Sequence, residues 1–348
     1  MDTSVFDYDL PASHIAQHSV EPRDHARMLC MDRTTGALED KHVLDLPSFL
    51  RPTDLLVFND SKVFKARFVA EKLSTGAKLE IFFLRSTNEV SWIVLAKPAK
   101  RLSMGDRLRL AGGWEALVVN KHEDGTITLV LPQGIDAFFA YSDEFGEIPT
   151  PPYVQADEHV QQSYQTVYAK NTGSVAAPTA GFHFTERLLK ELDAKGVRRA
   201  FVTLHVGLGT FRPMKDGTLE EHVMHQEWGH VSQETMEAIK QTKARGGRVI
   251  AVGTTAVRAL ESAARTGLSE WSGNTSLFIT PGYSFRVIDG LITNFHLPKS
   301  TLIVLVSTFA GTEHVKHAYQ HAIEQNYRFY SFGDAMCILS SQETTKTI

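Results

Sequence analysis

The sequence lacks several features that mark specialised classes of protein. It has only two cysteines in 348 residues, Cys30 and Cys337, and neither stands in a metal or redox motif. So few cysteines exclude a disulfide scaffold and suit a reducing compartment, so we expect a cytoplasmic protein. No apolar run is long enough to span a bilayer, and the first residues, MDTSVFDYDLP, have neither the basic nor the apolar region of a secretory signal.

The sequence also has no excess of positive charge and no metal-ligand motif. The formal net charge is -4, which argues against a protein that coats nucleic acid non-specifically. Any contact with nucleic acid must therefore come from a local basic patch. The 15 histidines include closely spaced pairs such as His222 and His225, but none stands in an H-E-x-x-H pattern or beside a thiol. We expect no metal site.

The sequence that is present divides into two patterns. Between about residues 63 and 131, short strands follow one another without a helix, and Asp124-Gly125 marks a hairpin between two of them. This run predicts a small antiparallel barrel or sandwich, because one open sheet would leave exposed edges. Elsewhere strands and helices alternate, which predicts an α/β fold with a mostly parallel sheet flanked by helices. We expect a discontinuous domain of residues 1–62 and 150–348 with a β-barrel domain, 63–149, inserted into it.

Capping residues place the helices of the larger domain. Thr185 and Ser232 each precede a run with apolar residues at helical spacing, and glycines follow both runs. The segment STLIVLVSTFAG is ambiguous from its composition, but the serine at its start favours a buried helix over a strand.

The turn in VIAVGTTAVRALESAA is a candidate anion site. Gly253, Thr254 and Thr255 stand where a strand ends and a helix begins, so free backbone N–H groups and the positive end of the helix can hold a carboxylate or phosphate. Arg258, one turn into the helix, can add a forked donor to the same anion. The alternatives are a capped turn without a ligand, and a surface ion pair between Arg258 and Glu261.

Two further glycine-rich segments allow close approach of the backbone. HVGLGTFRP carries Gly207 and Gly209 after a strand, but the third glycine of a dinucleotide fingerprint is missing and Pro213 interrupts the expected helix. In SVAAPTAGFHFT, Pro178 and Gly181 stand too close together for a regular helix or strand. His183 follows between two phenylalanines, either facing a ligand or satisfied within the core.

Basic residues gather in the predicted barrel and at its junction with the larger domain. KPAKRLSMGDRLRL and FNDSKVFKARF supply them, and they are either a solvated surface or a contact for a phosphate backbone. The basic residues that would make such a contact are Lys62, Lys65, Arg67, Lys97, Lys100 and Arg101.

Several long blocks in one order closely resemble the S-adenosylmethionine:tRNA ribosyltransferase-isomerase family of queuosine synthesis. They are DLLVFNDSKVFKARF, YQTVYAKNTGSVAAPTAGFHFT, FVTLHVGLGTFRP, GGRVIAVGTTAVRALESAA, LITNFHLPKSTLIVLVSTFAG and YRFYSFGDAMCIL, and the likeness covers essentially the whole chain. Two departures are Lys62, where the family pattern has arginine, and Phe182, where it has leucine. Lysine keeps the charge but loses the bidentate geometry of arginine.

The resemblance implies transfer of the ribosyl part of S-adenosylmethionine to 7-aminomethyl-7-deazaguanine at the wobble position of tRNAs with a G-U-N anticodon. Adenine and methionine leave, and the ribose is rearranged to give epoxyqueuosine. It also implies an α/β domain with an inserted barrel and no cofactor, since S-adenosylmethionine is a co-substrate. We expect a monomer.

This chemistry needs proton transfers in a pocket that excludes water. An alkyl amine must lose a proton before it attacks, and departing adenine benefits from a donor at its nitrogens. The catalytic candidates are His183, Asp60, His205, His296 and Asp334. The residues expected around S-adenosylmethionine, whose methionine carboxylate we place at the turn beside Arg258, are Pro178, Thr179, Gly181, Gly207, Gly209, Gly253, Thr254, Thr255 and Arg258.

Anticodon bases can be splayed out and stacked on aromatic side chains, for which Tyr164, Tyr168 and Tyr283 are candidates. Two other functions are compatible with parts of the sequence: an S-adenosylmethionine-dependent RNA methyltransferase, although its usual glycine-rich fingerprint is missing, and a non-catalytic RNA-binding protein that uses the barrel.

Overall fold

The larger domain is built on a nine-stranded sheet that is covered on both faces. The computed structural model describes residues 1–149, 153–154, 163–207, 213–267 and 269–340. The strands lie in the order β15-β13-β12-β3-β14-β16-β17-β1-β2. Their bounds are β1 Arg27–Asp32, β2 Leu38–His42, β3 Leu55–Asn59, β12 Arg198–Leu204, β13 Glu227–Val231, β14 Val249–Val252, β15 Trp271–Thr275, β16 Gly290–Asn294 and β17 Ala335–Leu339.

The sheet is parallel at its centre and contains antiparallel pairs toward both edges. The neighbours β12, β3, β14 and β16 run parallel, whereas β13 and β15 continue the sheet antiparallel. On the other side β17 is antiparallel to β16 and parallel to β1, on which Cys30 lies opposite Cys337 without a disulfide. The predicted α/β architecture is confirmed, with a sheet in which four of the eight neighbouring pairs are parallel.

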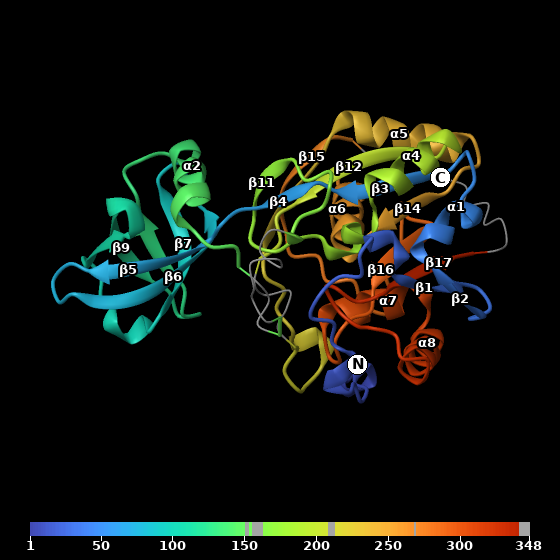
Figure 1. Ribbon diagram of the computed structural model, residues 1–348, viewed down its shortest axis with the longest axis horizontal. Helices are drawn as coiled ribbons and strands as arrows, with labels where there is room; N and C mark the ends of the chain where they lie inside the picture. Colours follow the sequence, from blue (N-terminus) through green and yellow to red (C-terminus); the bar gives the residue numbers. More distant parts are fainter. Residues whose placement is uncertain (150–152, 155–162, 208–212, 268, 341–348) are drawn as a thin grey trace.

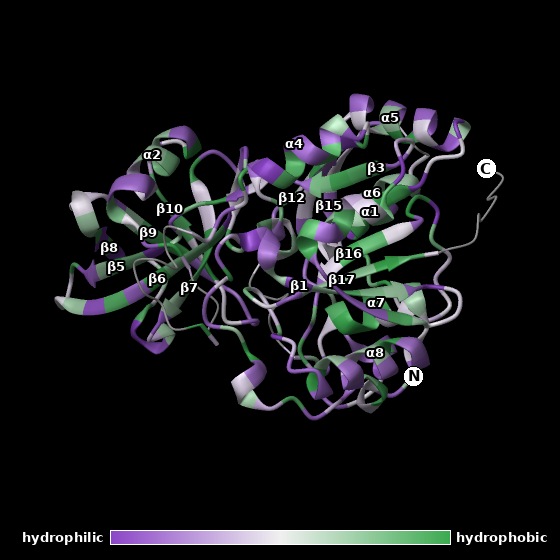
Figure 2. Cartoon of the chain, turned by 45° about the vertical axis from the view of Figure 1, so that its right-hand side comes forward, coloured by the Kyte–Doolittle hydropathy of each residue, from purple (hydrophilic) through white to green (hydrophobic). Residues whose placement is uncertain are grey.

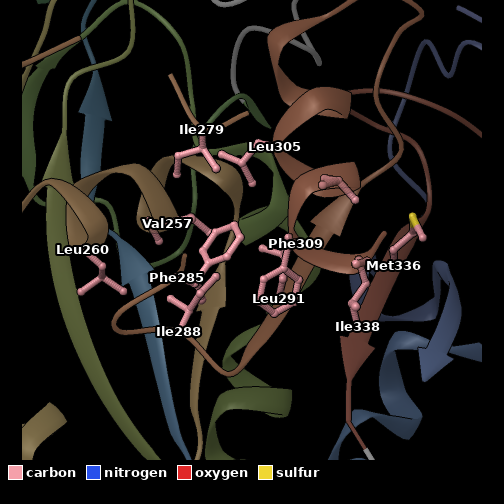
Figure 3. Close-up of a cluster of buried hydrophobic side chains, with 14 of the residues drawn as sticks. Val257, Leu260, Ile279, Phe285, Ile288, Leu291, Leu305, Phe309, Met336 and Ile338 are labelled. Atoms are coloured by element: carbon pink, nitrogen blue, oxygen red, sulfur yellow. The ribbon is translucent and has the colours of Figure 1, made fainter. Parts of the chain in front are cut away.

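Successive residues of the central strands point to opposite faces and build two cores. Leu55 and Val57 of β3 pack into the cluster that contains α6 and α7, while Leu56 and Phe58 pack into the cluster that contains α4. Figure 3 shows the first cluster, in which Val257, Phe285 and Phe309 meet between the helices and the sheet. In Figure 2 the central strands are mostly hydrophobic, as strands buried on both faces must be.

The helices begin at the caps that the sequence predicts. Thr185, Ser232 and Ser300 each accept a hydrogen bond from a backbone N–H of the first turn. The ambiguous segment after Pro298 is therefore helical, and it is buried along most of its length. The helices of this domain are α1 Leu46–Phe49, α4 Glu186–Ala194, α5 Gln233–Ala244, α6 Thr254–Ala264, α7 Thr301–Ala310 and α8 Thr312–Glu324.

A closed six-stranded barrel stands beside the larger domain (Figure 1), as the run of short strands predicts. All its pairings are antiparallel, in the order β10-β7-β6-β5-β8-β9. Helix α2, Ile135–Phe145, inserts Phe138 against Trp92 at a ring distance of 4.2 Å and so fills the barrel core. The strands are β5 Arg67–Lys72, β6 Ala77–Ser86, β7 Ser91–Lys97, β8 Arg107–Leu110, β9 Glu115–Lys121 and β10 Ile127–Val130.

A short parallel ribbon links the two parts. It consists of β4, Ser61–Val63, and β11, Asn171–Ser174. Just inside the barrel, Arg67 and Glu147 exchange two backbone hydrogen bonds of 3.1 and 2.9 Å. The strand that enters the barrel therefore lies directly beside the segment that leaves it.

Candidate functional site

A cleft opens where the parallel strands of the larger domain end. Ligand sites of α/β sheets gather at this edge, because the loops after the strands diverge there. The cleft is lined by six separate stretches of the chain, from Ala177 to Ser331. Its lining residues are Ala177, Pro178, Thr179, Ala180, Val206, Gly253, Thr254, Thr255, Thr293, Asn294, Phe295, His296, Leu302, Tyr330 and Ser331.

The turn before α6 forms one wall of the cleft and has the geometry of an anion site. Gly253 adopts φ 88°, a conformation that strains other residues, and donates its own N–H to Ile292. The next N–H groups begin the helix and have no intrahelical partner. Within the described part of the chain, neither the buried Thr254 hydroxyl nor Thr255 Oγ1 has a hydrogen-bond partner. The cleft therefore contains unpaired donors at the positive end of a helix.

A chain of hydrogen bonds runs from the opposite wall into the core. Thr179 Oγ1 donates to Asn294 Oδ1 at 3.3 Å, and Asn294 Nδ2 lies 3.2 Å from His183 Nε2. His183 also donates to the backbone of Arg23, which leaves Nε2 as the acceptor for Asn294. Burial, with the nearby cations Arg328 and Arg23, lowers the pKa of His183 to about 4. The imidazole is therefore neutral at pH 7 and fixes the orientation of the Asn294 amide.

His183 thus lies one side chain behind the cleft. The sequence prediction that it faces the ligand is not what the structure shows, because Asn294 and Thr179 stand between them. The small residues before it are explained by close packing: a Cβ on Gly181 would come within 1.9 Å of Tyr168 Oη. The backbone at Pro178 and Thr179 is thereby held in the wall of the cleft.

His296 lies in the cleft wall itself. Its Nε2 is 3.0 Å from Thr293 Oγ1, and burial lowers the pKa of His296 to about 3. Among the described residues no hydrogen bond to its Nδ1 is formed. Beside it, Tyr330 has φ 77°, an uncommon backbone conformation for a buried aromatic residue, and its ring packs edge-on against Tyr153 at 4.0 Å. Such strained residues often cluster at functional sites.

Two of the predicted catalytic carboxylates have structural partners outside the cleft. Asp60 accepts from Thr203 Oγ1 at 2.7 Å and from Asn171 Nδ2 at 3.0 Å, which ties the β4–β11 ribbon to β12. Asp334 accepts from the backbone N–H groups of Arg27 and Arg328. Neither lines the cleft, so the structure supports an organising role for both.

His205 also lies outside the cleft, although the next residue, Val206, lines it. Its Nδ1 is 3.4 Å from Ser61 Oγ, and its ring stacks on Trp228. Burial lowers the pKa of His205 to about 4. Gly207 donates its N–H to Glu227 and does not line the cleft, and Gly209 lies outside the described residues.

Arg258 is buried in an ion pair, not exposed to the cleft. It pairs with Glu227 and donates Nε to the Leu277 carbonyl at 3.2 Å. Glu261, the alternative partner expected from the sequence, instead accepts backbone N–H groups from Arg286 and Val287. Arg258 lines a second cavity of about 270 Å³ that shares only Leu302 with the cleft, so a direct contact with an anion at the turn is not formed.

The residues predicted to bind RNA fall into two groups. Lys62, Lys97, Lys100 and Arg101 are exposed, whereas Lys65 and Arg67 are half-buried near the junction. Lys65 donates to the Asp143 carbonyl and Arg67 pairs with Glu80. Of the aromatic candidates, Tyr164 is fully buried against Phe182 and Phe332 and offers no free face to a base. Tyr168 is half-buried and packs on Phe58 and Phe201.

Sequence reasoning missed several residues of the cleft and its surroundings. Asn294 and Thr293 end a fully buried strand, and their polar side chains after an apolar run were the available signal. Tyr330 and Ser331 join the cleft through a loop whose path the sequence does not specify. Glu227 and Trp228 lie on β13, Glu227–Val231. The available signal was the alternation of this strand, which puts the carboxylate of Glu227 on one face and the rings of Trp228 and His230 on the other.

Two general features bear on the kind of site. Within the described ranges, no group of three or more His, Cys, Asp and Glu side chains could hold a metal ion. In the same part of the chain, every helix is too short or too polar to cross a bilayer.

Comparison with known proteins shows that this chain is similar, over nearly its whole length, to a known family and to a solved structure. The sequence model of a family described as "Queuosine biosynthesis protein" matches residues 3–338. The chain is also similar to a solved structure, the S-adenosylmethionine tRNA ribosyltransferase of Thermotoga maritima, with 37% identity and a TM-score of 0.57. That match covers 97% of this chain and 100% of the other.

Proposed function

The chain belongs to the queuosine biosynthesis protein family, and on that premise we propose how its cleft carries out ribosyl transfer and isomerisation from S-adenosylmethionine to tRNA. The protein is an enzyme, an S-adenosylmethionine:tRNA ribosyltransferase-isomerase. The observation that carries the mechanism is the cleft at the ends of the parallel strands, where the unpaired donors of the α6 turn face a wall of neutral polar side chains. We further propose that S-adenosylmethionine is a co-substrate and that no other cofactor takes part.

The donor binds with its methionine carboxylate at the turn of Gly253, Thr254 and Thr255. Free N–H groups and the positive helix end favour an anion there. Arg258 does not touch the carboxylate in this arrangement. Its ion pair with Glu227 instead fixes α6 and, through the Gly207 N–H, the start of the loop after β12.

The sulfonium and sugar then face the wall of Thr293, Asn294 and His296. Both imidazoles nearby have a lowered pKa, about 4 for His183 and about 3 for His296, so they are neutral at pH 7. A protonated imidazole would repel the positive sulfonium in this poorly solvated site. Neutral His296 accepts a proton or hydrogen bond from the attacking amine or from the carbon beside sulfur, and Asn294, held by His183, orients the sugar.

For the RNA, we propose a tRNA with a G-U-N anticodon that carries 7-aminomethyl-7-deazaguanine at the wobble position, bound by one protomer. The amine of that base displaces adenine at the sugar, and methionine leaves in the rearrangement that gives epoxyqueuosine. Lys97, Lys100 and Arg101 are exposed on the barrel and suit contacts with the phosphate backbone.

The test is incubation with S-adenosylmethionine and the modified tRNA, followed by mass analysis of the RNA and measurement of free adenine. We expect both a mass gain in the RNA and stoichiometric adenine. Donor labelled in its methyl group separates the alternatives: label in the RNA would show a methyltransferase, and binding without adenine release would show a non-catalytic RNA-binding protein. Either result would contradict the proposal.

A further inference from the structure

Three rings form a stacked row at the side of the sheet next to the barrel ribbon. His205 follows β12, and Trp228 and His230 lie on the neighbouring strand β13, where period-two alternation puts them on one face. The His205 and Trp228 rings are 5.2 Å apart with planes at 23°, and the Trp228 and His230 rings are 6.4 Å apart with planes at 15°. We call these three residues the ring row.

The ring row is closed at one end and accessible at the other. A Cβ on Gly173 of β11 would come within 2.5 Å of His205 Nε2, so the ribbon packs directly against that imidazole. Trp228, in contrast, is 42% exposed, and His230 is half-buried. An indole is usually withdrawn from water, and this one is covered by no apolar cluster of the described residues.

The neighbours of the ring row favour a negatively charged, aromatic ligand. In the strand register, His230 faces Ser272 and Trp228 faces Asn274, both uncharged. The carboxylate of Glu227 is buried against Arg258 and therefore does not repel an anion from the exposed face. Lys62, exposed on β4, pairs with Thr172, the residue before Gly173. Lys62 follows Ser61, whose Oγ lies 3.4 Å from His205 Nδ1, so a cation lies one residue along the chain from the closed end of the row.

The ring row also adjoins the cleft. His205 belongs to the row and Val206, the next residue, lines the cleft, so the two sites flank the same strand end. Because His205 and Val206 are consecutive, a single-stranded segment that puts one base at the cleft passes close to the row.

We propose that the ring row binds an unpaired nucleobase of the anticodon loop, packed against the exposed edge of Trp228 and the outer face of His230, next to the nucleotide that reacts in the cleft. The proposal rests on the function proposed above and names a subsite for its RNA substrate. Proteins that recognise single-stranded RNA stack its bases on aromatic side chains beside a basic track. A protein partner fits less well, because one exposed indole among serine, asparagine and histidine offers little apolar area.

The first test is the affinity for an anticodon stem-loop RNA, measured by fluorescence anisotropy. Trp228→Ala removes the exposed indole and the ring on which His230 stacks, so its Kd should rise about tenfold, within the range measured for loss of one stacked base. Trp228→Phe keeps a ring and should raise Kd less than threefold. Leu44→Ala is the matched control, because Leu44 is similarly exposed, 37%, but lies beyond β2 at the opposite edge of the sheet; its Kd should not change.

The second test separates binding from folding and from chemistry. Trp228→Ala should keep the wild-type melting temperature and the wild-type KM for S-adenosylmethionine in the adenine-release assay, with only the KM for tRNA raised. If Trp228→Ala fails to fold, His230→Ala replaces it in the binding assay, with a smaller rise in Kd expected. RNA should also quench wild-type tryptophan emission more than that of Trp228→Phe.

Two outcomes would overturn this inference while leaving the proposed function intact. One is an active wild type whose Trp228→Ala variant binds RNA with unchanged affinity. The other is a change in sedimentation of the RNA-free protein on the same substitution, which would make the row an interface between copies. A wild type that releases no adenine from donor and tRNA would instead refute the proposed function.

Discussion

The barrel and the larger domain place their polar groups in opposite ways. Between residues 64 and 149 the only buried polar side chain is Ser142, and the core is a set of stacked and edge-on aromatic rings. The larger domain buries aspartates, histidines and the Arg258–Glu227 pair. A buried polar group costs stability unless it is paired, so its presence marks a demand other than folding. The difference agrees with the proposal that the larger domain performs the chemistry and that the barrel offers a surface for RNA.

The largest expected effect is loss of stability when the buried ion pair is broken. Arg258→Ala leaves Glu227 buried without its charge partner, and such losses cost about 3–5 kcal/mol. The barrel supplies a matched control in Arg107→Ala, because Arg107 pairs with Glu115 at 2.6 Å on the surface; exposed pairs contribute less than about 1 kcal/mol. Urea unfolding measures the free energy of unfolding of both variants. An equal loss of stability in the two would contradict this prediction.

The next effect is on catalysis. Asn294→Ala removes the amide between His183 and Thr179, so we expect kcat/KM for adenine release to fall about 100-fold, the size typical of losing an oriented hydrogen-bonding group in an active site. Asn120→Ala, at an exposed barrel position, should leave the rate unchanged. A normal rate in Asn294→Ala would remove this residue from the mechanism.

Substitutions on the barrel surface should change the affinity for tRNA and leave the chemical step unchanged. Reversing two charges, Lys100→Glu with Arg101→Glu, should weaken tRNA affinity about tenfold and reduce the steepness of its salt dependence, since fewer counterions are released. The KM for S-adenosylmethionine should stay the same. Unchanged tRNA affinity across a salt titration would show that these side chains are only a solvated surface.

The smallest effect is a pH dependence of stability that originates in the larger domain. Burial lowers the pKa of His183 to about 4 and that of His296 to about 3, whereas both titrate near 6.5 in the unfolded chain. Below pH 6.5 the unfolded chain binds more protons, so stability falls as the pH drops toward 4, by up to about 1.4 kcal/mol per pH unit for each imidazole.

The measurement is the free energy of unfolding at several pH values between 7 and 4.5. His183→Gln removes one titrating group and should flatten the slope. The same variant tests catalysis: near wild-type ribosyl transfer with the fold intact would exclude an acid or base role for His183. A wild-type stability that stays level over this range would contradict the lowered pKa values.

The sequence predicted the fold well because its signals are local. Hairpin turns, caps at Thr185, Ser232 and Ser300, and strand–helix alternation each depend on neighbouring residues only. The Gly253–Thr255 turn was found for the same reason, as a strand that ends in glycine before a helix.

The site was harder to predict, because its geometry depends on contacts between distant segments. His183 and Asn294 are 111 residues apart, and their hydrogen bond and the packing of Gly181 against Tyr168 both depend on the folded arrangement. Asp60 and Asp334 carry the right chemistry, but their oxygens are satisfied by partners that no local pattern reveals. Arg258 pairs across to β13, not along its own helix.

The paired backbone at Arg67 and Glu147 bears on how the barrel domain can be replaced, in evolution or by engineering. The two ends of the barrel segment meet there. A short linker can therefore replace the barrel without a change in the order of strands in the nine-stranded sheet. An exchange of the barrel would therefore alter the surface that we propose for RNA and leave the strands around the cleft unchanged.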